Sequence, residues 1–356
     1  MNRKILVINP GSTSTKIAVF SGEKQVFQKN ISHSLKDIAR YERIIDQYDF
    51  RKNIIIKELE QANINLNEFD AIVGRGGLLK PIESGTYGIN ETMIKTFKNG
   101  EYGEHASNLG GMIAYNIGKQ SGIPSYIVDP VVVDEMEPLA RLSGMPELKR
   151  ISIFHALNQK AVGRKAAEDL GKKYEEINLI IVHLGGGISV GAHKKGRVID
   201  VNNALNGDGP YTPERTGGLP SWPLIEFALS GKYNTNELKK KIKGKGGVVA
   251  YLGTNDMRKV EEKVLNGDSG YRLIFEGMAY QVAKEIGGLS AVLKGEVDAI
   301  VLTGGLAYSE IFVEWIKDRV GFISKILIYP GEDEMRALAL GCLRVLTGKE
   351  KAKKYD

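Results

Sequence analysis

Apolar and polar positions follow the same plan in two distant stretches of the chain. Residues 4–30 run from KILVI through the turn NPGSTS into KIAVF, and a second glycine turn returns the chain. Residues 177–203 repeat this order with LIIVHL, the turn GGG, ISVGA and a return at KKG. Alternation with period two between glycine turns predicts three consecutive strands in each stretch.

A second pair of similar segments follows the first pair in the same order. EFDAIVGRGGL at 68–78 and EVDAIVLTGGL at 296–306 each predict a short buried strand that ends in a Gly-Gly turn. Two matching pairs in one order indicate an internal duplication. The second half has a longer spacing between its two segments, which leaves room for a helix-rich insertion around 205–270.

Helical periodicity separates the predicted strands. The clearest helical patterns lie at 107–122, 154–172, 270–295 and 332–348. Strands interleaved with helices predict an α/β architecture whose ligands bind where strands end, between the two halves.

Length and composition support a two-domain globular protein. A chain of 356 residues suits two domains, and 42% hydrophobic with 26% charged residues is typical of globular proteins. No apolar run is long enough to predict a membrane span. The N-terminus enters a strand pattern within four residues, which leaves no room for a secretory signal, so we expect a cytoplasmic location.

Cysteine content and charge exclude several classes of protein. The single cysteine, Cys342, excludes an internal disulfide and a thiolate cluster, and its apolar helical context predicts a buried, inert thiol. The net charge is +6, but the basic runs at 238–247 and 348–354 have no interleaved aromatic residues. We therefore expect a solvated face and a frayed terminus there, and no nucleic-acid partner.

Two glycine-rich turns are candidates for phosphate binding. In the first, Asn9 to Lys16, glycine allows close backbone approach, Ser12 and Ser14 offer hydroxyls, and Lys16 supplies a cation. An ordinary hairpin turn is the alternative. The chain contains no GxxxxGK[ST] sequence, so this turn is not a Walker A loop.

The second turn, Gly185-Gly186-Gly187, leads into a strand pattern rather than a helix. This context excludes a dinucleotide-binding fingerprint and predicts a second phosphate-facing hairpin. Thr303-Gly304-Gly305, in contrast, closes a strand and opens a helical pattern, where backbone donors suit a nucleotide.

The ordered motifs resemble the acetate and butyrate kinase family along nearly the whole chain. They are INPGSTSTK, VGRGG, EHASNLGG, IVDPVVVDEM, FHALNQK, HLGGGIS, YTPERTGG, GTNDMR, LTGG and GEDEM. The resemblance implies duplicated ribonuclease H-like (actin-like ATPase) domains with an interdomain cleft. It implies an N-terminal domain of residues 1–150, joined by a C-terminal helix at about 338–356, and a C-terminal nucleotide-binding domain of residues 151–337. GRGGLLKP and HLGGGIS are more similar to butyrate kinase than to acetate kinase.

The resemblance also implies a reaction, in which ATP and butanoate give ADP and butanoyl phosphate by direct in-line transfer with Mg²⁺. A carboxylate is already an ionised nucleophile, so the enzyme mainly positions two anions and neutralises charge. Arg75 would bind the carboxylate, Arg215 the phosphoryl group, and His155 its equatorial oxygens. The other implied contacts are Asn9 and His105 near the same groups, and Asp129 and Glu334 toward Mg²⁺.

The remaining implied residues divide between the two substrates. On the phosphate and nucleotide side lie Ser12, Ser14, Lys16, His183, the 185–187 turn, Asp256, Arg258, Gly304 and Gly305. On the acid's side lie Gly76, Gly77 and Pro213. Each candidate has a structural alternative: Arg75 as a surface ion-pair partner, His155 and His183 as structural histidines, Asp129 as a turn former, and Glu334 as a helix N-terminal charge.

Gly76 and Gly77 stand where acetate kinases carry two valines, and we expect them to leave room for a longer alkyl chain. Each buried methylene contributes about 0.8 kcal/mol, so this preference would be graded.

Two alternatives to a butyrate kinase remain open. One is a kinase for branched-chain or other short acids, such as isobutyrate, propionate or acetate. The other is a non-kinase ATPase of the actin fold, which would need an appended partner-binding domain. We expect a carboxylate and a nucleotide as partners and no membrane. The family implies a homo-oligomer, a dimer or higher.

Overall fold

The computed structural model describes residues 2–356, which fold into two compact units. Unit 1 comprises the N-terminal segment as far as Val133 together with Asp333–Asp356, and unit 2 comprises Asp134–Glu332. The chain therefore passes from one unit to the other twice.

Unit 1 is built on a seven-stranded sheet with the strand order β12-β5-β6-β4-β1-β2-β3. Its first three strands form the predicted antiparallel hairpins, and β4 and β6 extend the sheet in parallel with β1. The strands are β1 (Lys4–Pro10), β2 (Ser14–Ser21), β3 (Lys24–Ser32), β4 (Ala71–Arg75), β5 (Thr86–Gly88), β6 (Ser125–Val128) and β12 (Lys353–Lys354).

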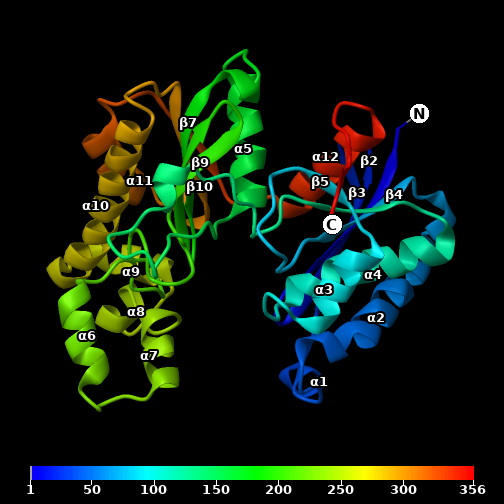
Figure 1. Ribbon diagram of the computed structural model, residues 1–356, viewed down its shortest axis with the longest axis horizontal. Helices are drawn as coiled ribbons and strands as arrows, with labels where there is room; N and C mark the ends of the chain where they lie inside the picture. The colour runs from blue at the N-terminus through cyan, green and yellow to red at the C-terminus, as the bar shows by residue number, and fades with distance from the viewer. Residues whose placement is uncertain (1) are drawn as a thin grey trace. The chain divides into compact units, whose positions relative to one another are not determined.

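Helices cover both faces of this sheet. Leu6 and Ile8 of β1 pack into a buried cluster with Ile55 of α2 and Ile113 of α4, and these two helices run beside each other (Figure 1). The opposite face is covered by α12, which contacts β1, β4 and β6. The helices are α1 (Leu35–Ile38), α2 (Tyr48–Gln61), α3 (Glu91–Asn99), α4 (Ala106–Ser121) and α12 (Glu334–Leu346), with short 3-10 turns η1 (Ile44–Gln47) and η2 (Leu66–Glu68).

Unit 2 repeats the sheet of unit 1. Its order, β11-β10-β7-β8-β9, corresponds strand for strand to β6-β4-β1-β2-β3. Ala71 of β4 pairs with Ile5, and the matching Ala299 of β10 pairs with Leu179, so even the register agrees. The duplication predicted from the sequence is confirmed. The strands are β7 (Asn178–Leu184), β8 (Ile188–Lys194), β9 (Arg197–Val201), β10 (Ala299–Gly304) and β11 (Ile326–Pro330).

The sheet of unit 2 also lies between helices, with α10 and α5 on opposite sides of β7 (Figure 1). Ile180 of β7 packs with Met278 of α10, whereas the next residue, Ile181, packs with Ala166 of α5. The helices are α5 (Ala156–Asp169), α6 (Ser221–Leu229), α7 (Thr235–Ile242), α8 (Val248–Leu252), α9 (Met257–Leu265), α10 (Ser269–Val292) and α11 (Glu310–Val320), with 3-10 turns η3 (Pro138–Arg141), η4 (Tyr174–Glu176) and η5 (Gly305–Tyr308).

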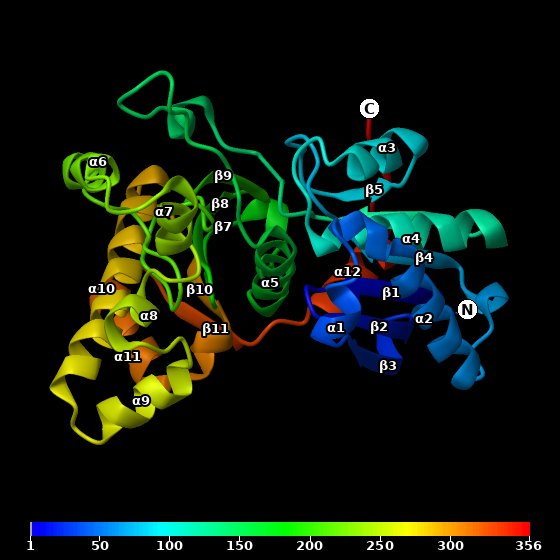
Figure 2. The ribbon, with the colours of Figure 1, turned by 90° about the horizontal axis from the view of Figure 1, so that it is seen from below.

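The two units exchange their last helices. Helix α5 follows β6 of unit 1 in the sequence but packs on β7 and β10 of unit 2. Helix α12 follows β11 of unit 2 but packs on the sheet of unit 1, where it lies next to β1 in Figure 2.

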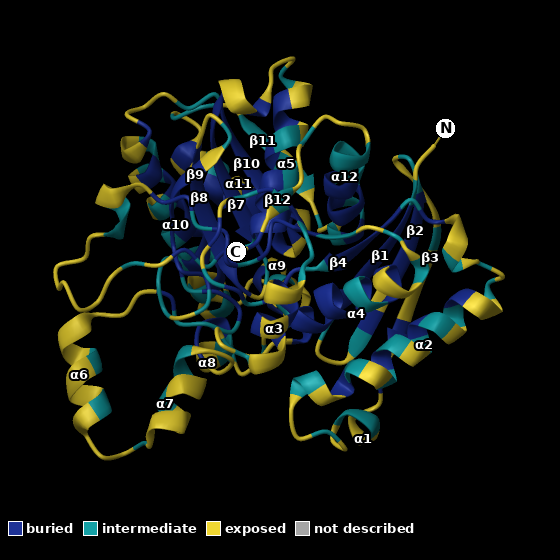
Figure 3. Ribbon diagram, turned by 45° about the vertical axis from the view of Figure 1, so that its right-hand side comes forward, coloured by how far each residue is buried: buried dark blue, intermediate teal, exposed yellow. Residues whose placement is uncertain are grey.

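Burial agrees with most of the sequence predictions. Figure 3 shows the strands of unit 2 as buried and α6 and α7 as largely exposed, so the basic run at 238–247 is mostly solvated. Cys342 is buried, which raises the pKa of its thiol to about 12. Among residues 2–356, no helix is both long and apolar enough to span a bilayer.

The expectation of a frayed C-terminus is wrong. Lys353 and Lys354 form β12 against β5, and Tyr355 is only 3% exposed. Glu350 accepts a hydrogen bond from the backbone N–H of Thr86 at 2.7 Å. Strand pairing and one buried aromatic residue therefore order a segment whose charge alone indicated disorder.

The close approach of β4 and α4 generates a stability prediction. A Cβ atom on Gly74 would lie 2.1 Å from the carbonyl oxygen of Gly110, so Gly74→Ala should lower the free energy of unfolding by about 3 kcal/mol. The control is Gly288→Ala in α10, where nothing lies within 4 Å and helix propensity should stabilise by up to about 1 kcal/mol. Equal urea midpoints for the two variants would contradict this packing.

Candidate active site

Unit 1 contains a polar cavity of about 220 Å³ at the ends of β1 and β4. The parallel pairing of these strands brings Asn9 and Arg75 to the same edge of the sheet. Six of the residues predicted from the sequence line the cavity, together with Pro10, Gly11 and Ser107; they are Asn9, Ser14, Lys16, Arg75, His105 and Glu334.

Glu334 contributes a carboxylate to the lining of this cavity. As the first residue of α12, it receives a hydrogen bond from Asn9 Nδ2 at 2.7 Å and forms an ion pair with Arg75 through its other oxygen. Asn9 is nearly buried, and about a quarter of each charged side chain is exposed. Arg75 and Asn9 thus bind both oxygens of one carboxylate.

The first glycine-rich turn is held by Arg51 of α2, a residue that the sequence pattern did not indicate. Arg51 is 1% exposed and donates to the carbonyl oxygens of Gly11, Ser12 and Ser14 at 2.8 to 3.1 Å. A fourth bond goes to Thr15 Oγ1 at 3.1 Å, and burial lowers the pKa of the guanidinium. One side chain therefore fixes the conformation of the turn and places a positive charge behind it.

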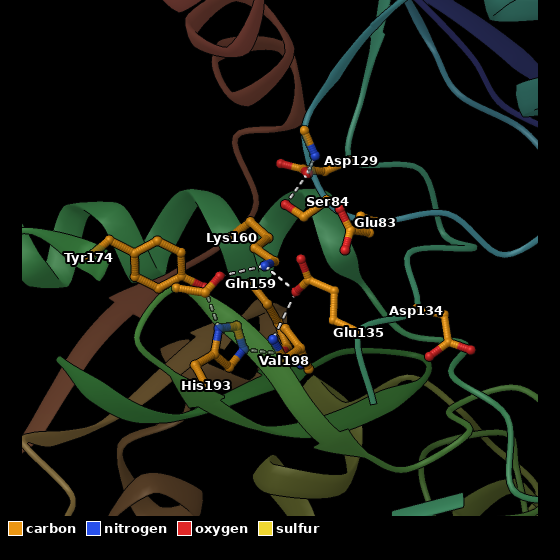
Figure 4. Close-up of polar contacts among 12 residues, drawn as sticks. Glu83, Ser84, Asp129, Asp134, Glu135, Gln159, Lys160, Tyr174, His193 and Val198 are labelled. Carbon is orange, nitrogen blue, oxygen red and sulfur yellow. Dashed lines mark hydrogen bonds and ion pairs between the residues drawn. The ribbon is translucent and has the colours of Figure 1, made fainter. Parts of the chain in front are cut away.

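His105 and Asp129 occupy different positions in unit 1. His105 is exposed at the N-cap of α4, where its Nδ1 accepts the backbone N–H of Ser107 at 3.2 Å. Asp129 is 2% exposed and accepts bonds from Ser84 Oγ at 2.6 Å and Gly85 N–H at 2.8 Å; Figure 4 shows the Ser84 contact. Asp129 has a backbone φ of 38°, a strained conformation of the kind that clusters at functional sites. It does not line the cavity that contains Glu334.

The interpretation of Gly76 and Gly77 as space for an alkyl chain is wrong. A Cβ atom on Gly77 would lie 2.1 Å from Asn108 Oδ1 and 2.6 Å from Asn108 Cα, at the start of α4. A Cβ atom on Gly76 would lie 2.8 Å from Pro130 Cβ. Both glycines allow close packing of the chain on itself, so a valine there would destabilise the fold rather than shorten a substrate pocket.

Unit 2 contains a second pocket, of about 310 Å³, where β7 and β10 end. The structure brings together residues from four separate motifs, as expected for a nucleotide site. The lining residues are Gly185, Gly186, Pro213, Glu214, Asn255, Asp256, Met257, Arg258, Glu261, Gly305, Leu306, Tyr308 and Ser309.

Asp256 and Arg258 pair at the start of α9, on the rim of this pocket. Asp256 is the N-cap residue and receives bonds from Arg258 Nε and Nη2 at 3.1 and 3.2 Å. The hydrogen bonds from Arg258 lower the pKa of the Asp256 carboxyl. Gly304, with φ of 90°, lies behind the lining and lets the end of β10 approach Leu184 of β7.

The second glycine turn and Arg215 lie against each other. Thr212 Oγ1 donates to the carbonyl oxygen of Gly186 at 2.7 Å and accepts the backbone N–H of Arg215 at 3.0 Å. A Cβ atom on Gly187 would lie 2.0 Å from Arg215 Nη1. The Arg215 Nε atom is buried without a hydrogen-bond partner among residues 2–356, and burial lowers the pKa of this side chain. An unsatisfied cationic donor beside a glycine turn fits an anion.

His155 contacts both strands of the same hairpin. It is the N-cap residue of α5, and its ring stacks on His183 with 3.7 Å between the ring centroids. Its Nδ1 lies 2.9 Å from Ser189 Oγ, and Ser189 pairs directly with His183 across β7 and β8. His183 is buried between Asn158 Oδ1, at 2.8 Å from its Nδ1, and Glu332 Oε1, at 3.1 Å from its Nε2. Unit 2 thus gathers His155, His183 and Arg215 at one hairpin.

Asp129 and Glu334, the two acidic residues expected near Mg²⁺, fit a metal ion that takes most of its ligands from water and phosphates. Both oxygens of Glu334 already have partners, and Asp129 Oδ1 accepts two hydrogen bonds. Residues 2–356 contain no group of three or more His, Cys, Asp or Glu side chains that could hold a metal. Carboxylate oxygens suit Mg²⁺, but phosphates and water would have to supply most of its coordination.

Comparison with known proteins finds a family similarity in unit 2. Residues 148–318 match the acetokinase family. The matched segment lies within unit 2 and contains His155, the 185–187 turn and Arg215.

Solved structures show that the fold extends over both units. The chain is similar to acetate kinase from Porphyromonas gingivalis, with 20% identity, a TM-score of 0.79, and coverage of 97% of this chain and 100% of that one. It is also similar to a propionate kinase from Francisella tularensis, with 19% identity and a TM-score of 0.73, and to acetate kinase from Entamoeba histolytica, with 17% identity and a TM-score of 0.75. Each of these two matches covers 95% of this chain and 98% of the other chain. These similarities show the actin-like ATPase fold that the duplicated sheets indicate.

The role of Arg51 generates a prediction about the first turn. Arg51→Met removes the donor of several part-buried carbonyl oxygens at once, so the free energy of unfolding should fall by about 3 kcal/mol. Lys57→Met, on an exposed position of the same helix, should change it by less than about 0.5 kcal/mol. Urea unfolding of both variants measures the difference, and a small loss in Arg51→Met would rule out the guanidinium as the support of the turn.

Proposed function

We propose that the protein transfers the γ-phosphate of ATP to a short-chain carboxylic acid, with butanoate as the preferred acid. The observation that carries this proposal is the carboxylate held by Arg75 and Asn9 in unit 1. Here the carboxylate is that of Glu334, and the same two donors suit the carboxylate of an acid substrate. The match of residues 148–318 to the acetokinase family supports phosphoryl transfer as the reaction.

The reaction needs no general base. One oxygen of the ionised acid attacks the γ-phosphorus, the bond from phosphorus to the β–γ bridging oxygen breaks, and ADP leaves as the acyl phosphate forms. The protein's task is to position both anions and to stabilise the charge on the transferring phosphoryl group. Cationic and neutral hydrogen-bond donors serve this task, and both units carry them.

In unit 1, Arg75 exchanges Glu334 for the carboxylate of the acid, and Asn9 and His105 contact the same groups. Ser12, Ser14 and Lys16 face phosphate oxygens from a turn that Arg51 keeps rigid. When Mg²⁺ is bound with the nucleotide, it neutralises phosphate charge; Glu334 and Asp129 would help to hold it, largely through water.

In unit 2, the Nε–H of Arg215 and a hydrogen bond from His155 stabilise the transferring phosphoryl group. His183 orients His155 through ring stacking. The pocket lined by Gly185, Asp256 and Tyr308 takes the nucleotide, with the phosphates at the glycine turns. Its exposed aromatic side chain, Tyr308, provides a stacking surface for adenine.

The preference for butanoate rests on motif similarity alone, because Gly76 and Gly77 do not open a pocket. GRGGLLKP and HLGGGIS support butanoate over acetate. Branched acids such as isobutyrate, and propionate, are the alternatives within the same reaction. The proposal includes a homo-oligomeric assembly, which the family resemblance supports.

The decisive experiment incubates the protein with Mg-ATP, hydroxylamine and each straight or branched acid from two to six carbons, and measures acyl hydroxamate. We expect the highest kcat/KM with butanoate. Arg75→Ala should lower kcat/KM at least a hundredfold, because the acid loses its charged partner. Arg336→Ala removes an arginine that pairs with Glu23 at the surface of the same unit, and it should retain activity. Absence of hydroxamate with every acid would reject the function, and full activity of Arg75→Ala would reject the carboxylate site.

The nucleotide pocket has its own test. Tyr308→Ala should raise the KM for ATP roughly three- to tenfold through loss of stacking, with little change in the KM for the acid. Tyr308→Phe keeps the ring and should behave as the wild type. A normal KM for ATP in the alanine variant would exclude Tyr308 from adenine binding.

A further inference from the structure

A chain of buried hydrogen bonds connects Tyr174 to His155 through unit 2. Tyr174 OH lies 2.6 Å from His193 Nδ1, and His193 Nε2 lies 2.9 Å from Gln159 Oε1. Gln159 Nε2 lies 2.8 Å from Ser189 Oγ, which in turn lies 2.9 Å from His155 Nδ1. Figure 4 shows the first part of this chain, from Tyr174 through His193 to Gln159. Gln159, Ser189 and His193 are each completely buried.

One backbone carbonyl group fixes the direction of the whole chain. Gln159 Nε2 lies 3.0 Å from the carbonyl oxygen of Ser189, which can only accept a hydrogen bond. This contact orients the Gln159 amide, so that its NH₂ group faces Ser189 and its Oε1 faces His193. His193 Nε2 must therefore donate to Gln159.

His193 is neutral in this environment. Its complete burial holds the pKa well below the ordinary value, and the positive charge of Lys160 adds to the effect. Lys160 is itself buried and pairs with Glu135 at 2.6 Å (Figure 4). A neutral imidazole has one proton, which His193 carries on Nε2, so Nδ1 accepts the hydroxyl proton of Tyr174.

The same logic fixes the proton of Ser189. Its Oγ accepts hydrogens from Gln159 Nε2 at 2.8 Å and from the backbone N–H of His155 at 3.5 Å. Both lone pairs are then occupied, so the single hydroxyl hydrogen is donated to His155 Nδ1. His155 Nδ1 is then an acceptor, which leaves the proton of the imidazole on Nε2.

We propose that Ser189 and Gln159 are positioning residues that hold His155 in its Nε2-protonated form, as a hydrogen-bond donor to anionic oxygens. In the other tautomer, Nε2 would present a lone pair and repel a phosphoryl oxygen. The effect on turnover rests on the proposed function, whereas the tautomer is a property of the protein alone.

A glycine within strand β8 supports this assignment independently. A Cβ atom on Gly191 would lie 2.6 Å from Gln159 Oε1 and 3.2 Å from His193 Nε2. Glycine is unfavourable inside a strand unless another group needs the space. At this position it leaves room for the hydrogen bond between Gln159 and His193.

The test is a ¹⁵N–¹H long-range correlation spectrum of the histidine rings, which distinguishes the two neutral tautomers. The chain has only five histidines, and the signal lost in His155→Gln assigns the ring of interest. We expect the Nε2–H tautomer for His155 in the wild type, a mixture in Ser189→Ala, and recovery in Ser189→Thr. Gln159→Met should shift the tautomer equilibrium of His155 in the same direction as Ser189→Ala. Ser290→Ala, which removes a hydroxyl from α10, should leave the spectrum unchanged.

Kinetics provide the second measurement. Ser189→Ala should lower kcat roughly ten- to a hundredfold at an unchanged KM for ATP, and Ser189→Thr should restore kcat. A wild-type His155 protonated on Nδ1, or an unchanged ring in Ser189→Ala, would overturn the inference. If the tautomers behave as expected but the wild type forms no acyl phosphate, the inference is supported and the proposed function fails.

Discussion

Helices cover both faces of each sheet, and this constraint decides where polar chemistry can occur in the protein. Strand interiors such as Val7 in unit 1 and Val301 in unit 2 are completely buried. On these central strands a functional side chain can therefore reach solvent only where the strand ends. Asn9 and Arg75 lie at the ends of two parallel strands, and Gly185 follows the end of β7. Both candidate sites lie at the carboxyl ends of the parallel strands.

The sequence predicted the elements whose pattern is local. Both triple-stranded hairpins follow from alternation interrupted by glycine, and four of the helices follow from their apolar periodicity. Parts of the predicted site also came together in each unit, because ordered motifs identify the strand ends that the fold makes neighbours. Asp129 and Gly304 line neither pocket, and Pro213, predicted on the acid's side, lines the pocket of unit 2.

The features that the sequence did not predict depend on neighbours distant along the chain. Arg51 looks like an exposed position of a helix, since its partners are carbonyl and hydroxyl oxygens 36 to 40 residues earlier and do not affect the helical pattern. The absence of a side chain at Gly77 suggested space for a substrate, but the backbone at Asn108 occupies that space. A glycine in the sequence can indicate that another group packs close to the backbone. Only the structure shows whether that group is a ligand or another part of the protein.

The exchange of α5 and α12 has a consequence for biosynthesis. Unit 1 begins at the N-terminus, yet the helix that covers one face of its sheet comes from residues 334–346, near the other end of the chain. During translation the β1–β4–β6 sheet would remain bare on that face until residues 334–346 have left the ribosome, by which point unit 2 has all its segments. The unit made first is thus the last to be completed, and nascent chains are exposed to chaperones and to aggregation through that apolar surface.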